Sequence, residues 1–251
     1  MQLDGRVAFL TGAGSGIGRA GALALAREGA IVTVTDLDGT RAEGVADEIR
    51  SAGGRADAMA LDAADDAAVT AAINTVAARG RLDILHSHAG IQVPGRLTET
   101  TPESMDASWR LNVRAHFVAA RAAMPHMQAQ RKGSIIITAS NSGVQYDRGM
   151  IAYCTTKHAV IAMTRQIAVD YAADNIRCNA LCPGFVDTPF NHGFEVQMGG
   201  RQALESYVAR SIPMGRWASV DEIAASIVYL ASDQSGFMTG HALVIDGGEC
   251  L

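Results

Sequence analysis

The apolar and polar positions of the chain follow two alternating patterns along its whole length. Short apolar runs of strand length precede longer stretches in which apolar residues recur every three or four positions. The runs predict strands near residues 6–11, 30–36, 55–62, 82–90, 133–140, 175–184 and 241–248, and the periodic stretches predict helices near residues 19–30, 40–54, 65–80, 103–128, 153–172 and 220–231. Strands that alternate with helices indicate a parallel sheet covered on both faces.

No linker, low-complexity segment or internal repeat interrupts this pattern. We therefore expect residues 1–251 to form one doubly wound α/β domain of the Rossmann type. In such sheets ligands bind beyond the carboxyl ends of the strands. The residues with the clearest chemical potential all follow predicted strands, so they are expected to meet at that edge.

Composition narrows the possible functions. The chain has 48% hydrophobic and 19% charged residues and a formal net charge of −5, which is typical of a globular protein and gives no nucleic-acid-binding surface. No apolar run is long enough to span a membrane, and the N-terminus does not resemble a signal peptide, so a cytoplasmic location is expected. Four sparse cysteines form no metal-binding pattern and are expected to be buried, reduced thiols: Cys154, Cys178, Cys182 and Cys250.

The first predicted strand ends in a glycine-rich turn that favours dinucleotide binding. Gly12 allows a tight exit from the strand, Gly16 lets the backbone approach a pyrophosphate, and Gly18 lets the following helix pack closely. The amides at the start of that helix would then face the phosphates. Asp36 ends the second strand, where its carboxylate can accept hydrogen bonds from ribose hydroxyls and would repel a 2′-phosphate. The pattern predicts NAD rather than NADP, although Asp36 could instead only cap a turn.

The stretch from Ser140 to Lys157 predicts a proton-transfer unit. Tyr153 and Lys157 are one turn apart on a predicted helix, so their side chains share a face. A lysine charge beside a tyrosine hydroxyl favours the phenolate and lowers the pKa of the phenol, which suits a general acid or base acting on an alcohol. The Tyr-x-x-x-Lys spacing is common by chance, and only its place after the fifth strand makes it persuasive.

Taken together, these motifs resemble the short-chain dehydrogenase/reductase family from Gly5 to the terminal Ile-Asp-Gly-Gly. The resemblance implies seven parallel strands, a substrate oxygen oriented by Ser140, and proton transfer by Tyr153. It also implies that Lys157 holds the nicotinamide ribose and that Asn112 anchors a water in a proton relay. The implied cofactor-binding residues are Gly12, Ser15, Gly16, Ile17, Gly18, Asp36, Leu37, Asp62, Ala63, His88, Ala89, Gly90, Tyr153, Lys157, Pro183, Gly184, Val186 and Thr188, with Asp62 and Ala63 at the adenine and Val186 and Thr188 at the carboxamide.

One motif departs from the family. Where the family usually has Asn-Asn-Ala-Gly after the fourth strand, this chain has Ser87-His88-Ala89-Gly90. Ser87 can still make a short side-chain hydrogen bond to a neighbouring backbone group. The change is either a tolerated scaffold difference or one that alters cofactor affinity or its pH dependence.

We expect Gln92, Ser140, Ser142, Gln145, Tyr153, Phe185 and His192 to border the substrate. Residues 189–212 are expected to form a substrate loop, and glycines and aromatic residues between 189 and 201 suit a lid. An ordinary mobile loop that contacts a neighbouring subunit is the alternative. Several hydrogen-bonding groups favour a hydroxylated or cyclic substrate, and Arg148 or Arg201 could meet an anionic group.

These observations favour an NAD-dependent dehydrogenase that interconverts a secondary alcohol (a sugar, polyol or cyclic alcohol) with its ketone or lactone. One alternative is a ketone reductase, such as a 3-oxoacyl-carrier-protein reductase, and Asp36 speaks against its usual NADPH. The other is a non-catalytic dinucleotide-binding regulator, which would be expected to have lost Ser140, Tyr153 or Lys157. The resemblance also implies a homotetramer, with a small-molecule alcohol or ketone as the only other partner.

Overall fold

The structure contains the parallel sheet that the alternating pattern predicts, and this sheet has seven strands. The computed structural model describes residues 1–251, with the strands in the order β3-β2-β1-β4-β5-β6-β7. From β1 the chain adds β2 and β3 towards one edge of the sheet, and it then returns to add β4 to β7 on the other side of β1. This reversal confirms the predicted doubly wound fold. The strands are β1 Val7–Leu10, β2 Ile31–Asp36, β3 Arg55–Ala60, β4 Ile84–Ser87, β5 Gly133–Thr138, β6 Ile176–Pro183 and β7 Ala242–Ile245.

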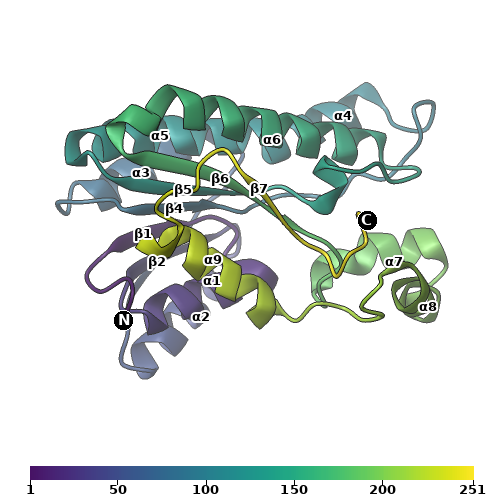
Figure 1. Ribbon diagram of the computed structural model, residues 1–251, viewed down its shortest axis with the longest axis horizontal. Helices are drawn as coiled ribbons and strands as arrows, with labels where there is room; N and C mark the ends of the chain where they lie inside the picture. The colour runs from purple at the N-terminus through teal and green to yellow at the C-terminus, as the bar shows by residue number, and fades with distance from the viewer.

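Two layers of helices cover the sheet. Figure 1 shows α5 and α6 above it and α1, α2 and α9 below it. The upper layer consists of α3 Asp66–Ala77, α5 Ala115–Gln130 and α6 Ile151–Tyr171, and the lower layer of α1 Gly16–Arg27, α2 Gly39–Ser51 and α9 Val220–Ala231. None of the helices is both long and apolar enough to cross a membrane.

Each face of the sheet has its own hydrophobic core. Ile135 and Ile137 of β5 pack with α3, α5 and α6, whereas Ile136 between them packs with α1, α2 and α9. Successive side chains of a strand point to opposite faces, and both faces are buried. This is why the central strands are continuously apolar rather than alternating.

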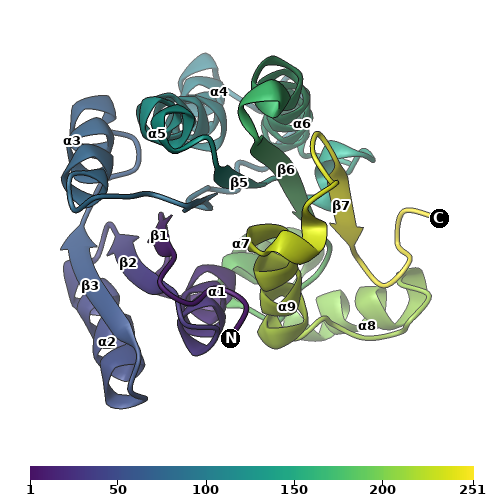
Figure 2. The same cartoon turned by 60° about the vertical axis from the view of Figure 1, so that its left-hand side comes forward.

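The segment predicted as a substrate loop is mostly helical. It contains a short turn, Pro189–Asn191, followed by α7 His192–Met198 and α8 Arg201–Ser211. Leu204 and Val208 are one turn apart on α8 and both are buried, so they form the apolar face that holds this helix in place. Figure 2 shows α8 beyond the end of β7, on the same side as the C-terminus.

The long helix predicted at residues 103–128 is divided. It consists of α4 Pro102–Trp109, a π-helical turn Arg110–Arg114 and then α5. A π turn inserts an extra residue, which changes the direction in which the following side chains point, and such turns are frequent at functional sites. Asn112 lies in this turn and is fully buried.

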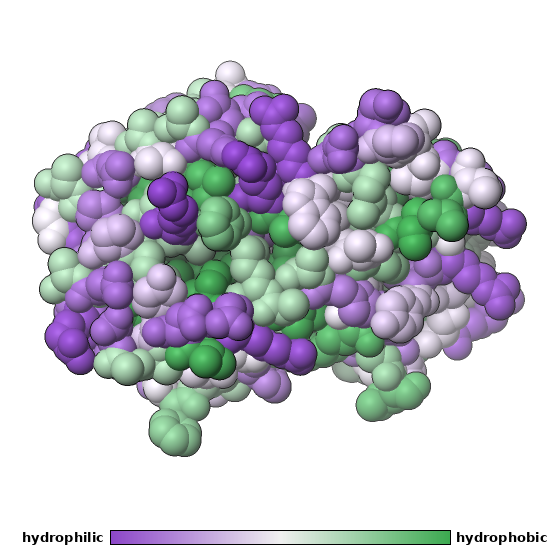
Figure 3. All heavy atoms as spheres, turned by 90° about the horizontal axis from the view of Figure 1, so that it is seen from above, coloured by the Kyte–Doolittle hydropathy of each residue, from purple (hydrophilic) through white to green (hydrophobic).

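The outer face of the upper helical layer carries apolar side chains among polar ones (Figure 3). Phe117 on α5 is 52% exposed, and Val169 on α6 is 77% exposed. Trp109 at the end of α4 is also exposed. Large apolar side chains on helices that pack on a sheet are candidates for contact with another protein surface.

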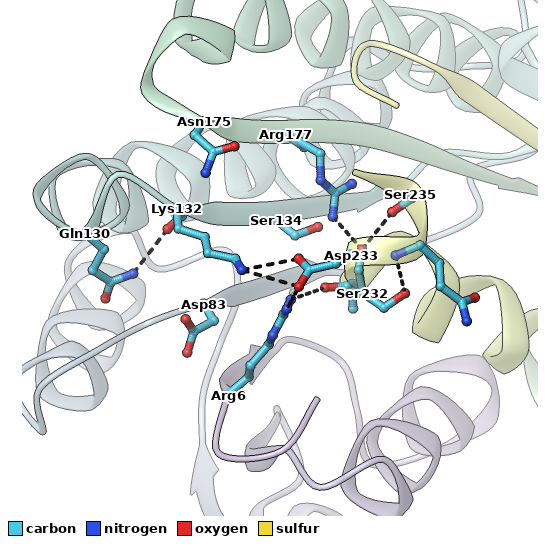
Figure 4. Close-up of polar contacts among 12 residues, drawn as sticks. Arg6, Asp83, Gln130, Lys132, Ser134, Asn175, Arg177, Ser232, Asp233 and Ser235 are labelled. Carbon is cyan, nitrogen blue, oxygen red and sulfur yellow. Dashed lines mark hydrogen bonds and ion pairs between the residues drawn. The ribbon is translucent and has the colours of Figure 1, made fainter. Parts of the chain in front are cut away.

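Polar contacts fix the amino edge of the sheet, opposite the carboxyl ends of the strands (Figure 4). Asp233 forms ion pairs with Arg6 and with Lys132, whose Nζ lies 3.3 Å from Oδ1. Arg177 donates to the carbonyl of Leu230 at 2.8 Å and to that of Ser232 at 3.1 Å. These donors satisfy backbone carbonyls at the end of α9, where a positive charge is also favourable to the helix dipole.

Three of the four cysteines are buried, free thiols, as expected. Cys154, Cys178 and Cys182 are free and buried, but Cys250 is exposed. Cys250 lies in the turn after β7, and its backbone N–H is held at 2.9 Å by Asp246. The expectation of burial was wrong for Cys250 because the final turn lies on the surface, outside the core.

Candidate active site

A cavity of about 360 Å³ lies at the carboxyl ends of the strands. Most of the predicted site residues line it, although they come from seven separate parts of the chain. Those lining it are Gly12, Ser15, Gly16, Ile17, Asp36, Leu37, Asp62, Ala63, His88, Ala89, Gly90, Ser140, Ser142, Tyr153, Lys157, Pro183, Gly184, Phe185, Val186 and Thr188. The parallel sheet brings them together because all its strands end at this edge.

Five predicted site residues do not line the cavity. Gly18 and Asn112 lie directly behind it, where they support its wall. Gln92, Gln145 and His192, which were predicted to border the substrate, are absent from the lining. The side chain of His192 is 80% exposed, and its Nδ1 lies 3.7 Å from Glu195 Oε2 in the first turn of α7.

The glycine turn has the geometry that its sequence predicts. Gly12 and Gly16 have φ values of +63° and +51°, in the region that favours glycine. A Cβ atom on Gly18 would lie 2.3 Å from the Gly12 carbonyl oxygen, so only glycine permits this close packing. Helix α1 begins at Gly16, and Gly16 and Ile17 both line the cavity, where the amides of a helix N-terminus can bind a phosphate.

Asp36 is held rigidly at the opposite side of this turn. Its Oδ2 accepts a hydrogen bond from Gly14 N at 2.9 Å, and its Oδ1 accepts one from Asp38 N at 3.0 Å. Arg41 in the first turn of α2 pairs with Asp38 at 3.3 Å. A fixed carboxylate with free lone pairs beside a glycine cradle fits the adenosine ribose and pyrophosphate of a dinucleotide.

Tyr153 and Lys157 lie on one face of α6, as predicted. Lys157 Nζ lies 5.6 Å from the centroid of the Tyr153 ring and donates to the Thr138 carbonyl at 2.9 Å. Burial raises the pKa of Tyr153, while the Ser140 side chain opposes that rise. Burial also lowers the pKa of Lys157 to about 8. The expected depression of the tyrosine pKa is therefore outweighed in this structure by the loss of solvation around the phenol.

Ser140 stands at the end of β5 and begins a chain of hydroxyls. Its Oγ accepts from Ser142 N at 3.1 Å and donates to Ser142 Oγ at 3.2 Å. Ser142 Oγ in turn donates to Asp147 Oδ2 at 2.5 Å. The hydrogen bonds fix the orientation of the Ser140 hydroxyl beside the cavity.

Asn112 supports the cavity from the π turn. Its Oδ1 accepts from Ile91 N at 2.8 Å and its Nδ2 donates to Ile91 O at 2.9 Å. A Cβ on Gly90 would lie 3.0 Å from Asn112 Oδ1, so the segment after β4 passes directly over this amide. The amide therefore fixes the backbone that follows His88 and Ala89.

The lining also contains residues that the sequence did not indicate, and two of them are carboxylates, Asp147 and Glu249. Asp147 lies in the bend between Ser140 and Tyr153, and Glu249 follows the last strand. The signal for Glu249 was present, because β7 is parallel to the other strands and its carboxyl end must meet the same edge. Nothing in the local sequence of Asp147 indicates that its side chain turns towards the cavity.

The unusual Ser87-His88 pair contacts the surroundings of two fully buried histidines, His86 and His116. His86 Nε2 and His88 Nδ1 each lie 3.0 Å from Thr138 Oγ1, and Ser87 Oγ lies 2.7 Å from His116 Nδ1. Burial lowers the pKa of His88 to about 4, with a smaller contribution from Lys157. A group with that pKa stays neutral between pH 6 and 9, which disfavours the hypothesis that His88 makes cofactor binding pH-dependent in this range.

These histidines predict acid sensitivity of the fold. Burial lowers the pKa of His86, His88 and His116 below the value near 6.5 of an unfolded histidine, so the unfolded chain binds more protons as the pH falls. Their stabilisation is complete above pH 6.5 and is lost as the pH falls below it. For His88 the loss is about 2 kcal/mol at pH 5.

Chemical denaturation of the wild type and of His88→Asn at pH 7 and pH 5 measures this loss. We expect the wild type to lose about 2 kcal/mol more than the variant between the two pH values. Equal losses in the two proteins would show that His88 is not held neutral by the fold.

Comparison with known proteins identifies the family. The model of a family described as "Enoyl-(Acyl carrier protein) reductase" matches residues 12–249. The chain is 40% identical to 2-keto-3-deoxy-L-fuconate dehydrogenase of Xanthomonas campestris, over 98% of this chain and 81% of the relative. It is 35% identical to 3-oxoacyl-[acyl-carrier-protein] reductase of Thermotoga maritima, over 99% of both chains. The chain belongs to the short-chain dehydrogenase/reductase family.

A solved structure supports the same conclusion. Gluconate 5-dehydrogenase from Burkholderia cenocepacia, in complex with NADP and tartrate, superposes with a TM-score of 0.93 at 35% identity, covering 99% of this chain and 96% of that one. As a member of this family, the chain is an oxidoreductase of the NAD(P)-dependent class. Among its relatives are dehydrogenases that act on alcohols and a ketoreductase, so the family alone does not decide the substrate or the choice between NAD and NADP.

Proposed function

We propose that this protein oxidises a secondary alcohol, such as a sugar, polyol or cyclic alcohol, to the ketone or lactone with NAD. One observation carries the proposal: Ser140, Tyr153 and Lys157 line the same cavity as the glycine turn and Asp36. A proton-transfer group and a dinucleotide cradle in one cavity suit an alcohol dehydrogenase. A non-catalytic regulator would not need the proton-transfer group.

In this proposal Tyr153 takes the hydroxyl proton of the alcohol and Ser140 orients the reacting oxygen. Lys157 holds the ribose and keeps a positive charge near the phenol, which opposes the effect of burial on the tyrosine pKa. When bound, the oxidised nicotinamide supplies the hydride acceptor and a further positive charge that favours the phenolate. Asn112 would act indirectly, by fixing the segment after β4 and by anchoring the water that links Lys157 to solvent.

The remaining lining residues are assigned to the cofactor. Asp36 would accept hydrogen bonds from the adenosine ribose, with Asp62 and Ala63 beside the adenine. Val186 and Thr188 would engage the carboxamide. The Asp36 carboxylate supports NAD over NADP because a 2′-phosphate at that position would face a fixed negative charge. The gluconate 5-dehydrogenase structure contains NADP, so a preference for NAD would distinguish this chain from that relative.

Initial rates with NAD and with NADP test the proposal directly. A panel of sugars, polyols and cyclic secondary alcohols is followed by absorbance of the reduced cofactor. We expect NAD-dependent oxidation of at least one panel member. Reduction of 3-oxoacyl thioesters with NADPH, in the absence of any NAD-dependent alcohol oxidation, would contradict it and favour the reductase alternative.

We also propose that the protein is a homotetramer. The exposed apolar side chains on α4, α5 and α6 support a contact with a second copy, because residues such as Phe117 and Val169 would be removed from water there. Light scattering coupled to size-exclusion chromatography measures the assembly. A mass of one chain, 26.3 kDa, would contradict the proposal.

A further inference from the structure

The substrate end of the cavity contains a carboxylate that comes from the C-terminal tail. Glu249 lines the cavity together with Tyr153, which is only 4% exposed. Glu249 Oε2 accepts a hydrogen bond from Asn141 Nδ2 at 2.9 Å, and its Oε1 accepts one from the Tyr207 hydroxyl at 3.3 Å. These two neutral donors, from the segment after β5 and from α8, hold the carboxylate in place without neutralising it.

A second carboxylate lines the same part of the cavity. Asp147 accepts from Ser142 Oγ, and no cation forms an ion pair with either Asp147 or Glu249. Burial raises the pKa of Glu249 to about 7, and repulsion from Asp147 and Asp246 adds to the rise. The carboxylates thus repel each other across a partly desolvated space, which costs free energy unless a positive charge enters it.

The arginines that might have received an anionic substrate are engaged elsewhere. Arg201 pairs with Asp187 at 3.0 Å, Glu195 at 3.2 Å and Glu205 at 2.8 Å, and its guanidinium lies 4.7 Å from the Trp217 ring centroid. Arg148 is exposed and does not line the cavity. The expectation that either arginine meets an anionic group therefore has no support in the structure.

Aromatic rings form the walls beside the two carboxylates. Phe185, Phe190 and Phe194 all line the cavity, and Phe185 meets Phe194 edge to face at 5.3 Å between centroids. Phe190 lies 6.4 Å from Tyr153, measured between ring centroids. Aromatic faces attract cations through their negative quadrupole, and this attraction is strongest in a desolvated site. Carboxylates within aromatic walls are a combination suited to an organic cation rather than to an inorganic one.

We propose that this end of the cavity binds an ammonium group, and that the alcohol oxidised by this enzyme is an amino alcohol. The inference rests on the proposed dehydrogenase function and narrows its substrate class. In the reaction the carbinol carbon loses a hydride to the oxidised cofactor, its hydroxyl oxygen loses a proton to Tyr153, and a ketone forms. The amine takes no part in the chemistry and is released unchanged.

Three alcohols of similar shape but different charge test whether the substrate end of the cavity prefers a positive charge. The probes are 3-aminocyclohexanol, cyclohexane-1,3-diol and 3-hydroxycyclohexanecarboxylate, each oxidised with NAD at pH 8. We expect kcat/KM to be highest for the amine and at least about 100-fold lower for the carboxylate, which corresponds to roughly 2.7 kcal/mol. Equal values for the amine and the carboxylate would overturn the proposal.

The Glu249→Gln variant tests the residue itself. Glutamine keeps the shape of the side chain and removes the charge. Its carbonyl oxygen can still accept the hydrogen bond from Asn141, and its amide NH2 can donate to the Tyr207 hydroxyl. We expect the ratio of kcat/KM for the amine to that for the diol to fall at least about tenfold. Asp106→Asn is the matched control, because Asp106 is an exposed carboxylate on α4 outside the cavity, and it should leave the ratio unchanged. An unchanged ratio in Glu249→Gln would overturn the role of this residue.

A binding measurement separates this inference from the proposed function. Calorimetric titration of the enzyme with cyclohexylamine and with cyclohexanecarboxylate, in the presence of NADH, reports charge preference without turnover. Binding of the amine only, with no alcohol oxidised, would support the ammonium site and contradict the dehydrogenase function. Binding of both ligands with equal affinity would overturn the ammonium site, whatever the activity.

Discussion

Replacing Tyr153 with phenylalanine is expected to lower kcat for alcohol oxidation by about 1,000-fold, while the Kd for NADH changes less than about threefold. The hydroxyl is the only group removed, and in the proposed mechanism it accepts the proton of the alcohol. Phenylalanine retains the buried ring 5.6 Å from Lys157 Nζ, so the cofactor side of the cavity keeps its shape. Steady-state rates and fluorescence titration with NADH measure the two quantities.

Tyr171→Phe provides the matched control for this variant. Tyr171 ends the same helix, does not line the cavity, and loses the same hydroxyl group. We expect its kcat to stay within about twofold of the wild-type value. Turnover by Tyr153→Phe at a tenth of the wild-type rate or more would remove Tyr153 from the proposed role.

Asp36→Asn is expected to lower the preference for NAD over NADP by about 100-fold, expressed as the ratio of the two kcat/KM values. A unit charge near a phosphate contributes a few kcal/mol at an effective dielectric of about 20, and salt reduces this value. Asparagine can still accept the hydrogen bond from Gly14 N through its Oδ1, but it loses the one from Asp38 N because its Nδ2 can only donate. Initial rates with both cofactors at fixed ionic strength measure the ratio.

Asp65→Asn is the control for the effect of charge alone. Asp65 caps α3 through Ala67 N and Ala68 N and does not line the cavity. We expect the cofactor ratio to remain within about threefold of the wild-type ratio. A wild-type enzyme that uses NADP as well as NAD would contradict the role assigned to Asp36.

If Glu249 binds an ammonium group, the C-terminal segment after β7 helps to determine which substrate the enzyme accepts. Glu249 and Asp147 line the substrate end of the cavity together, although they come from opposite ends of the catalytic half of the chain. The charge of these two carboxylates would then contribute to the selection of the substrate.

Local pattern was sufficient to predict the order of the elements. The apolar run at Ile135–Ile137 could only be a strand buried on both faces, and α9 spans Val220–Ala231 as predicted. Because parallel strands end at one edge, the positions of Gly12, Asp36 and Ser140 in the sequence also predicted that they would lie around one cavity. Periodicity did not predict the helices between residues 189 and 212, where the buried pair Leu204 and Val208 is too short a signal.

The sequence by itself determined the doubly wound fold, the dinucleotide cradle and the Ser140–Tyr153–Lys157 unit, because each depends on spacing within or directly after an element. Tertiary structure alone decided which way side chains point and how well water reaches them. It excluded Gln92, Gln145 and His192 from the lining and brought Glu249 to Asn141. It also decided that burial raises the pKa of Tyr153. Solvation depends on every neighbour in space, and most of those neighbours are distant in the chain.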